Sequence, residues 1–303
     1  MIQGKTILIT GGAGFVGNAL AQKLKLKNTV YVLDDFSSSS HHPVFQQFCE
    51  NNELNRIKFD EIFYTRGHTS NILSLLNDIA PDIIFHFGEF SRINESWNRK
   101  DEVYKSNLLG TSAVLDFCVA KKSFLVYSAS SAILANSEQT QLQSTPYTFT
   151  KSVMVSMVKH YADWYGLKYV ITYFYNVYGP GQIEDGPYAT VLGIFEKCYK
   201  NCTKLPVVQP GTQSRIFTHI NDITEGIIAA LQFENKDIPI ASNDECSIVT
   251  LAKLFVDESQ IEFLPARKGD RTKSTKTLED QLYKVGWKPK ENLFHYIESV
   301  KKM

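Results

Sequence analysis

Short apolar runs of strand length alternate with longer stretches of mixed polarity from the N-terminus to about residue 179. Two of the intervening stretches, 96–120 and 147–165, have the periodicity of helices. This alternation is typical of a parallel sheet with helices on both faces. The runs expected to form strands are KTILIT (5–10), TVYVLD (29–34), PDIIFHFG (81–88), SFLVYSA (123–129) and YVITYFYNVYG (169–179).

A glycine-rich turn follows the first expected strand and leads into the first expected helix. In TGGAGFVG, Gly11, Gly14 and Gly17 have the spacing of a dinucleotide-binding fingerprint, where small residues permit a sharp turn close to a pyrophosphate. The N-terminus of the following helix attracts that anion. Asp34 ends the second strand, and a carboxylate there can bind the adenosine ribose hydroxyls and would repel a 2′-phosphate. The pattern predicts NAD as cofactor.

These features together predict an α/β fold, a Rossmann doubly wound parallel sheet with a smaller mixed α/β substrate-binding lobe. After about residue 176, Pro, Gly and Asn become more frequent and the apolar runs become short and irregular. We therefore expect residues 1–175 and 213–240 to form the NAD-binding domain, and residues 176–212 and 241–303 to form the lobe.

Composition and charge indicate which classes of binding partner and which cellular location to expect. The chain is 43% hydrophobic and 21% charged, as ordinary globular proteins are, and its 32 basic and 32 acidic residues cancel, which favours neither nucleic acid nor membrane as a partner. Five cysteines without a CxxC pair indicate reduced thiols. Cys198 and Cys202 lack the further ligands that zinc needs, so we expect no metal site. With neither a signal peptide nor a membrane-spanning run, we expect a cytoplasmic location.

Tyr147 and Lys151 are the candidate catalytic pair. They stand four residues apart near the start of an expected helix, so both side chains project from one face. A phenol normally titrates at about 10, but an adjacent ammonium and the nicotinamide charge favour the phenolate, which is a useful base. The preceding run LVYSASSA ends in hydroxyl residues, and Ser131, or alternatively Ser130, could hold the substrate hydroxyl while Tyr147 removes its proton.

The motifs as a set resemble the extended short-chain dehydrogenase/reductase family, and within it the NAD-dependent epimerase/dehydratase branch that acts on nucleotide sugars. They are TGGAGFVG, the Asp34 strand end, HFGE, SSA, YTFTK and FYNVYGPG, and they extend along nearly the whole chain. The resemblance implies a triad of Ser131, Tyr147 and Lys151, with Asn107 in support, and a homodimer formed through 96–120 and 147–165. The expected cofactor-binding residues are Gly11, Gly14, Phe15, Val16, Gly17, Asp34, Asp35, Phe87, Gly88, Asn107, Tyr147, Lys151 and Tyr175.

The resemblance also implies a nucleotide-diphosphate sugar as substrate. Asn176, Arg215 and Arg267 fall where family members hold the diphosphate, a group that guanidinium forks suit. The expected substrate-binding residues are Glu89, Arg92, Ser131, Asn176, Arg215, Arg267 and Asp270.

Glu89 and residues 64–66 depart from the family pattern, and the role of His86 is interpreted separately. HFGE places Glu89 close to the nicotinamide and the sugar, where it could bind a sugar hydroxyl, assist as a base or pair with Arg92. Residues 64–66, Tyr-Thr-Arg, occupy the place where many relatives carry a Gly-Asp that contacts adenine. His86 is interpreted as a structural histidine bonded to backbone.

The residues after Ser131 bear on the reaction. Family dehydratases carry an acid and a base directly after the catalytic hydroxyl residue, whereas here Ala132 and Ile133 follow, and neither can transfer a proton. A 4,6-dehydratase is therefore disfavoured. We expect a nucleotide-sugar 4-epimerase, which oxidises C4 of the hexose and returns hydride to the opposite face. The alternatives are a 4-dehydrogenase that releases a 4-keto sugar and a non-catalytic dinucleotide-binding protein, against which the intact serine, tyrosine and lysine argue.

Overall fold

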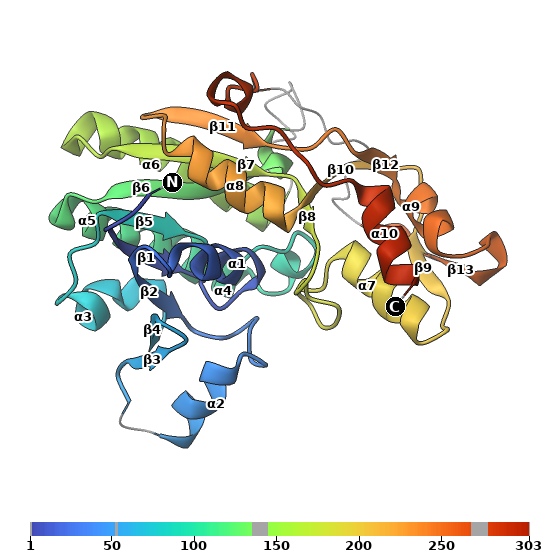
Figure 1. Ribbon diagram of the computed structural model, residues 1–303, viewed down its shortest axis with the longest axis horizontal. Helices are drawn as coiled ribbons and strands as arrows, with labels where there is room; N and C mark the ends of the chain where they lie inside the picture. Colours follow the sequence, from blue (N-terminus) through green and yellow to red (C-terminus); the bar gives the residue numbers. More distant parts are fainter. Residues whose placement is uncertain (1, 52–53, 135–144, 268–277, 303) are drawn as a thin grey trace.

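The computed structural model describes residues 2–51, 54–134, 145–267 and 278–302. Its centre is an eight-stranded sheet in the order β11-β7-β6-β5-β1-β2-β4-β3 (Figure 1). All neighbours in this sheet pair in parallel except the edge strand β3, which is antiparallel to β4. The strands are β1 (Thr6–Thr10), β2 (Thr29–Asp34), β3 (Ile57–Phe59), β4 (Ile62–Arg66), β5 (Ile83–His86), β6 (Phe124–Ser130), β7 (Tyr169–Phe174) and β11 (Lys236–Ile240).

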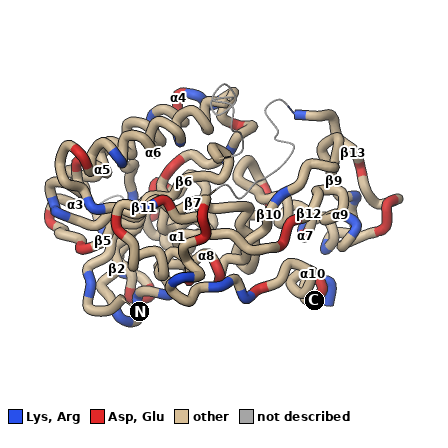
Figure 2. Tube along the Cα trace, turned by 90° about the horizontal axis from the view of Figure 1, so that it is seen from above, with Lys and Arg blue, Asp and Glu red and all other residues tan. Residues whose placement is uncertain are grey.

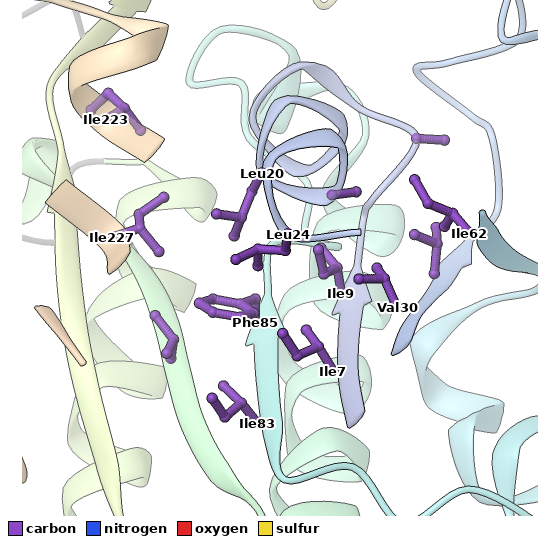
Figure 3. Packing of buried hydrophobic residues seen from close by; sticks show 14 of the residues in the cluster. Ile7, Ile9, Leu20, Leu24, Val30, Ile62, Ile83, Phe85, Ile223 and Ile227 are labelled. Carbon is purple, nitrogen blue, oxygen red and sulfur yellow. The ribbon is translucent and has the colours of Figure 1, made fainter. Parts of the chain in front are cut away.

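Helices cover both faces of the sheet because alternate residues of each strand point to opposite sides. Ile7 and Ile9 of β1 pack toward one layer of helices, and Leu8 belongs to the core on the other side. Figure 3 shows Leu20 and Ile227 from two helices of the first layer above the same strands. The first layer contains α1 (Phe15–Leu24), α2 (Pro43–Glu50) and α8 (Ile220–Ala230), and the second contains α3 (Ile72–Leu76), α5 (Thr111–Lys121) and α6 (Pro146–Tyr165). The doubly wound Rossmann sheet expected from the sequence is confirmed.

A smaller lobe stands at one end of the molecule (Figure 1). It has a three-stranded sheet of order β12-β10-β8, a parallel pair β13-β9 and a separate hydrophobic core that includes Phe195, Phe217 and Phe255. The mixed α/β lobe is thereby also confirmed. Its elements are β8 (Asn176–Tyr178), α7 (Val191–Lys200), β9 (Leu205–Val208), β10 (Ser214–His219), β12 (Glu245–Ser247), α9 (Ile248–Phe255), β13 (Ile261–Leu264) and α10 (Leu293–Lys301).

Two segments cross the domain boundaries expected from the sequence. β10 was expected in the NAD-binding domain, but it pairs with β8 and β12 of the lobe. Conversely, Leu282 and Trp287, from the segment expected in the lobe, pack into the core that α8 shares with the main sheet. Side-chain packing, which composition does not reveal, decides both placements. The division into two domains stays a prediction.

The stretch 96–120 forms several helical pieces rather than one uninterrupted helix. A 3-10 turn (Glu95–Trp97) precedes α4 (Lys100–Val103), and a π-helical turn (Tyr104–Gly110) connects α4 to α5. Such π-helical turns often occur at functional sites.

Charged residues of both signs are interspersed along the chain (Figure 2). Most ion pairs join exposed side chains, as in Lys168–Glu234, whose side chains are 64% and 51% exposed. The pair Lys151–Glu89 differs, because these side chains are only 5% and 2% exposed. Across the described residues, no helix has the length and apolar character to cross a bilayer, and no three metal-binding side chains form a cluster.

Candidate active site

A cavity of about 990 Å³ has walls from the main sheet and from the lobe. It brings together residues from distant parts of the sequence, and nearly all of the expected site residues are among them. Asn107 does not line it, and Asp270 lies outside the described residues. The expected residues that line the cavity are Gly11, Gly14, Phe15, Val16, Gly17, Asp34, Asp35, Phe87, Gly88, Glu89, Arg92, Ser131, Tyr147, Lys151, Tyr175, Asn176, Arg215 and Arg267.

The glycine-rich turn between β1 and α1 fits a dinucleotide. Gly11 has φ of +67°, and a Cβ there would lie 2.7 Å from the backbone nitrogen of Gly88. A Cβ on Gly17 would lie 2.3 Å from the carbonyl oxygen of Gly11, so the first turn of α1 packs directly on the loop. Gly14 caps α1 without a side-chain acceptor, and the first N–H groups of a helix have no acceptor within it. These groups can bind a pyrophosphate.

Asp34 fixes this turn from the end of β2. Its Oδ2 accepts a hydrogen bond from the backbone N–H of Ala13 at 2.9 Å, and its Oδ1 accepts one from Phe36 at 2.7 Å. Burial outweighs these bonds and raises the pKa of Asp34 to about 6. The neighbouring Asp35 is exposed, and its Oδ1 accepts from the backbone of Ser37 at 2.9 Å. Either carboxylate is placed to meet a ribose.

The departure of residues 64–66 from the family pattern bears on the adenine end of the site, which stays a prediction. None of the three lines the cavity, whereas 67–69, directly after β4, do. His68 is among them, and its Nδ1 accepts a hydrogen bond from the backbone N–H of Ser70 at 3.2 Å. Burial lowers the pKa of His68, which favours a neutral ring protonated at Nε2. The position of His68 just beyond the end of a parallel strand is the sequence signal that could have found it.

The start of α6 positions Tyr147 and Lys151. Thr145 Oγ1 accepts from the backbone N–H of Thr148, and Thr148 Oγ1 accepts from that of Thr145, both at 3.1 Å. Pro146 occupies the first helical position, where its fixed φ is favourable. Tyr147 and Lys151 follow on the first two turns and are 6% and 4% exposed. Local capping signals therefore determine where these two side chains enter the cavity.

Of the two candidate serines, Ser130 has its hydroxyl engaged locally. Ser130 Oγ accepts from the backbone N–H of Ala132 at 3.1 Å and so caps the 3-10 turn Ser131–Ile133 at the end of β6. Both serines line the cavity together with Tyr147 and Lys151. Ala132 and Ile133 are each 7% exposed and bring no proton-transfer group to the site.

Glu89 forms a buried ion pair with Lys151. Lys151 Nζ donates a hydrogen bond to Glu89 Oε2 and another, of 2.5 Å, to the carbonyl oxygen of Ser128. The second carboxylate oxygen, Oε1, accepts from Thr111 Oγ1 and from Tyr127 Oη, each at 3.1 Å. The sequence drew attention to Glu89 but did not indicate Thr111 or Tyr127, which no motif marks.

The expectation that Glu89 could pair with Arg92 was wrong. Arg92 Nη2 donates to the carbonyl oxygen of Tyr188, and the guanidinium carbon lies 5.9 Å from the centre of the Tyr188 ring. Its Nε is buried without a hydrogen-bond partner. Burial lowers the pKa of Arg92, and the nearby phenols of Tyr147 and Tyr188 oppose that shift. Among the described residues, no carboxylate forms an ion pair with Arg92.

His86 is fully buried at the end of β5, but its partners are not backbone groups as expected. Its Nδ1 lies 2.6 Å from Thr10 Oγ1, and its Nε2 lies 2.9 Å from Thr111 Oγ1. Burial lowers the pKa of His86 to about 4, so the ring is neutral at pH 7. The partners lie on another strand and on a helix, which the sequence pattern does not reveal.

Asn107 lies outside the cavity and holds two of the site's segments together by hydrogen bonds. It is fully buried in the π-helical turn; its Oδ1 accepts from the backbone N–H of Phe90 at 2.7 Å, and its Nδ2 donates to the Phe90 carbonyl at 3.0 Å. The same Nδ2 donates to Thr150 Oγ1 at 3.1 Å. Asn107 therefore connects the segment after Glu89 to the helix that carries Lys151. Asn107 itself does not line the cavity, and the cofactor contact expected for it stays a prediction.

Three expected substrate residues line the cavity from separate segments of the lobe. Asn176 begins β8, Arg215 lies in β10 and Arg267 follows β13. Asn176 Nδ2 donates to the carbonyl of Ile216 at 3.1 Å, and Arg215 Nη1 donates to that of Ser214 at 2.8 Å. Backbone carbonyls thus orient two of these side chains on one wall.

The fold and the glycine turn define a Rossmann protein that binds a dinucleotide. The sequence matches the NAD dependent epimerase/dehydratase family over residues 7–241, and the chain belongs to this family. It is therefore a member of an NAD-dependent enzyme family that comprises nucleotide-sugar epimerases, dehydratases and decarboxylases.

Relatives within the family carry out different reactions. The chain is 27% identical over 285 residues to a UDP-N-acetyl-alpha-D-glucosaminuronate decarboxylase from Bacillus cytotoxicus, covering 87% of this chain and 84% of the relative. It is 22% identical over 342 residues to a dTDP-L-rhamnose 4-epimerase from Burkholderia thailandensis, covering 97% and 93%. A UDP-glucose 4-epimerase from Thermotoga maritima, solved with UDP-glucose, has a similar fold, with a TM-score of 0.81, 24% identity and coverage of 98% and 97%.

Proposed function

We propose that this chain is a nucleotide-sugar 4-epimerase. The observation that carries the proposal is that Ser131, Tyr147 and Lys151 share one cavity with the glycine turn, while Ala132 and Ile133 offer no acid or base. A site with one proton-transferring phenol suits oxidation and reduction at a single carbon. A dehydratase needs a further acid and base to remove water.

The residues of this site divide the reaction among them. NAD, held by the glycine turn, would supply the acceptor for the C4 hydride and the donor that returns it. Ser131 Oγ orients the C4 hydroxyl, and Tyr147 Oη removes its proton during oxidation. Tyr147 then holds that proton and returns it during reduction, so no net proton is consumed. For inversion, the 4-keto sugar turns its other face to the cofactor before reduction.

The cavity wall suggests where each part of the ligands is held. The turn from Gly11 to Gly17 binds the cofactor pyrophosphate, and Asp34 and Asp35 bind its adenosine ribose. On the lobe side, Asn176, Arg215 and Arg267 bind the nucleotide diphosphate of the substrate. Glu89 lies in the same wall, but its carboxylate is engaged by Lys151, which argues against a direct bond to the sugar.

The test is incubation of the purified protein with a panel of UDP- and dTDP-sugars, chosen because relatives are named for them. Proton NMR resolves the products while absorbance follows reduced nicotinamide. We expect a C4-inverted sugar without net accumulation of reduced cofactor. If a 4-keto product accumulates together with reduced cofactor, the chain is a 4-dehydrogenase and not an epimerase. A product that has lost water or carbon dioxide would overturn both.

We also propose that the enzyme is a homodimer formed through the helices at 96–120 and 147–165. Leu109, Trp164 and Tyr165 are 63%, 58% and 59% exposed on neighbouring helical segments, and large exposed apolar groups mark interaction surfaces. Light scattering after size exclusion should give twice the mass of one chain for the wild type. The same mass after Leu109→Glu/Trp164→Glu would exclude this surface.

A further inference from the structure

We propose that Glu89 compensates the charge of Lys151 and thereby sets the pH at which Tyr147 acts as a base. The inference rests on the proposed function, in which Tyr147 exchanges a proton with the sugar. Glu89 acts through Lys151, so it is a positioning residue rather than a catalytic one.

The contacts of Glu89 are those of an ionised carboxylate. One oxygen meets the ammonium of Lys151, and the other accepts from the hydroxyls of Thr111 and Tyr127 at 3.1 Å each. With 2% of its side chain exposed, Glu89 is solvated by these groups rather than by water. A buried carboxylate is stable only when it is paired and hydrogen-bonded, and here both oxygens are satisfied.

A chain of buried hydrogen bonds points toward Glu89. The backbone N–H groups of residues 87 and 88 donate to Thr10 Oγ1 at 3.2 and 3.1 Å, which fills both of its acceptor positions. The Thr10 hydroxyl must therefore donate to His86 Nδ1. The neutral ring then carries its proton on Nε2 and donates to Thr111, whose own proton goes to Glu89. This directed chain is arranged to stabilise negative charge on Glu89.

Tyr147 and Lys151 stand one turn apart on α6 and line one cavity with Glu89. The Arg92 guanidinium and the Tyr127 phenol also interact electrostatically with Tyr147. A lone ammonium would strongly favour the Tyr147 phenolate, whereas a carboxylate bonded to that ammonium opposes it. This balance suits a group that must take a proton and later return it, because such a group works best when both protonation states are accessible near the operating pH.

The test is Glu89→Gln, which keeps the shape and removes the charge. We expect the acidic limb of the pH profile of kcat to move to lower pH by about one unit. In cofactor-free protein labelled at the tyrosine Cζ with carbon-13, the Tyr147 resonance, assigned by its loss in Tyr147→Phe, should ionise at lower pH than in the wild type. Glu234→Gln is the matched control, because it removes the carboxylate of the exposed pair with Lys168. It should change neither the pH profile of kcat nor the pH at which Tyr147 ionises.

A lower kcat with both midpoints unmoved would overturn the inference and leave Glu89 a purely structural residue. If Glu89→Gln does not fold, Lys151→Met is compared with Glu89→Gln/Lys151→Met, because removal of both charges of a buried pair is often tolerated. The Tyr147 phenol should then ionise at lower pH in the double variant than in Lys151→Met, and equal midpoints would contradict the inference. The NMR titration needs no substrate, so it separates failure of this inference from failure of the proposed epimerase.

Discussion

Two cations line the same cavity but are held in different ways. Lys151 is buried and has a carboxylate partner built into the protein, Glu89. Arg92, an expected substrate residue, is partly buried and is held by the carbonyl oxygen and the ring of Tyr188. A buried charge needs compensation, and where the protein supplies none, a ligand can. The difference suggests that Lys151 serves the chemical step and that Arg92 serves binding.

The largest effect is expected from removal of the Tyr147 phenol. Tyr147→Phe should lower turnover of the substrate about 10³-fold or more, because Tyr147 is the group proposed to take the C4 proton. Binding of reduced NAD, followed by its fluorescence, should persist. Tyr165→Phe, at an exposed position of the same helix, serves as control and should keep wild-type turnover. Full activity of Tyr147→Phe would rule out the mechanism.

The next effect concerns stability and tests the comparison directly. Glu89→Ala leaves Lys151 buried without its partner and should lower the free energy of unfolding by about 3–5 kcal/mol. Arg92→Met removes a partly buried cation that has no carboxylate partner among the described residues, so the free energy of unfolding should stay unchanged or rise. Urea denaturation measures both. Equal losses in the two variants would show that the cations do not differ.

A third effect comes from Asp34, a buried anion stabilised only by N–H groups. Its pKa is raised from 3.8 to about 6, so in that window the folded state binds a proton that the unfolded state has lost. The Asp34 contribution to the free energy of unfolding therefore falls as pH rises from 3.8 to about 6. A shift of this size corresponds to about 3 kcal/mol.

His86 has the opposite pH dependence. Its pKa falls from 6.5 to about 4 on folding, so stability is lost as pH falls through that range. Asp34→Asn removes the Asp34 contribution to the pH dependence and leaves that of His86. The free energy of unfolding of this variant should therefore rise more steeply with pH between pH 4 and pH 6.5 than that of the wild type. Denaturant titrations at several pH values measure this slope. An unchanged slope would mean that Asp34 is ionised throughout.

The smallest effect is expected in substrate affinity. Arg92→Met should raise KM for the sugar nucleotide about tenfold, equivalent to about 1.4 kcal/mol, with a smaller change in kcat. Arg92→Lys retains the charge but not the planar fork and should give an intermediate KM. Steady-state kinetics on the substrate found in the panel provides both values. A fall in kcat at constant KM would assign Arg92 to the chemical step and remove the contrast with Lys151.

The parts of the site that the sequence predicted are those whose geometry is local. Gly11, Gly14 and Gly17 act within one turn, and Tyr147 and Lys151 lie on adjacent turns of one helix. The parallel sheet could also be predicted, since buried strands need continuous apolar runs. The helix expected at 96–120 was predicted less well, because its π-helical turn responds to a contact between Asn107 and the distant Phe90.

The sequence alone therefore determined the fold class, the cofactor and the candidate catalytic pair, because each depends on the order and spacing of neighbouring residues. Only the tertiary structure decided which groups neutralise the buried charges. Glu89 and Lys151 are 62 positions apart, and His86 and Thr111 are 25 apart. Arg92, three residues from Glu89, does not bond to it. Burial makes a counter-charge necessary, but the chain supplies it from whichever element folding brings alongside, and no local pattern records that choice.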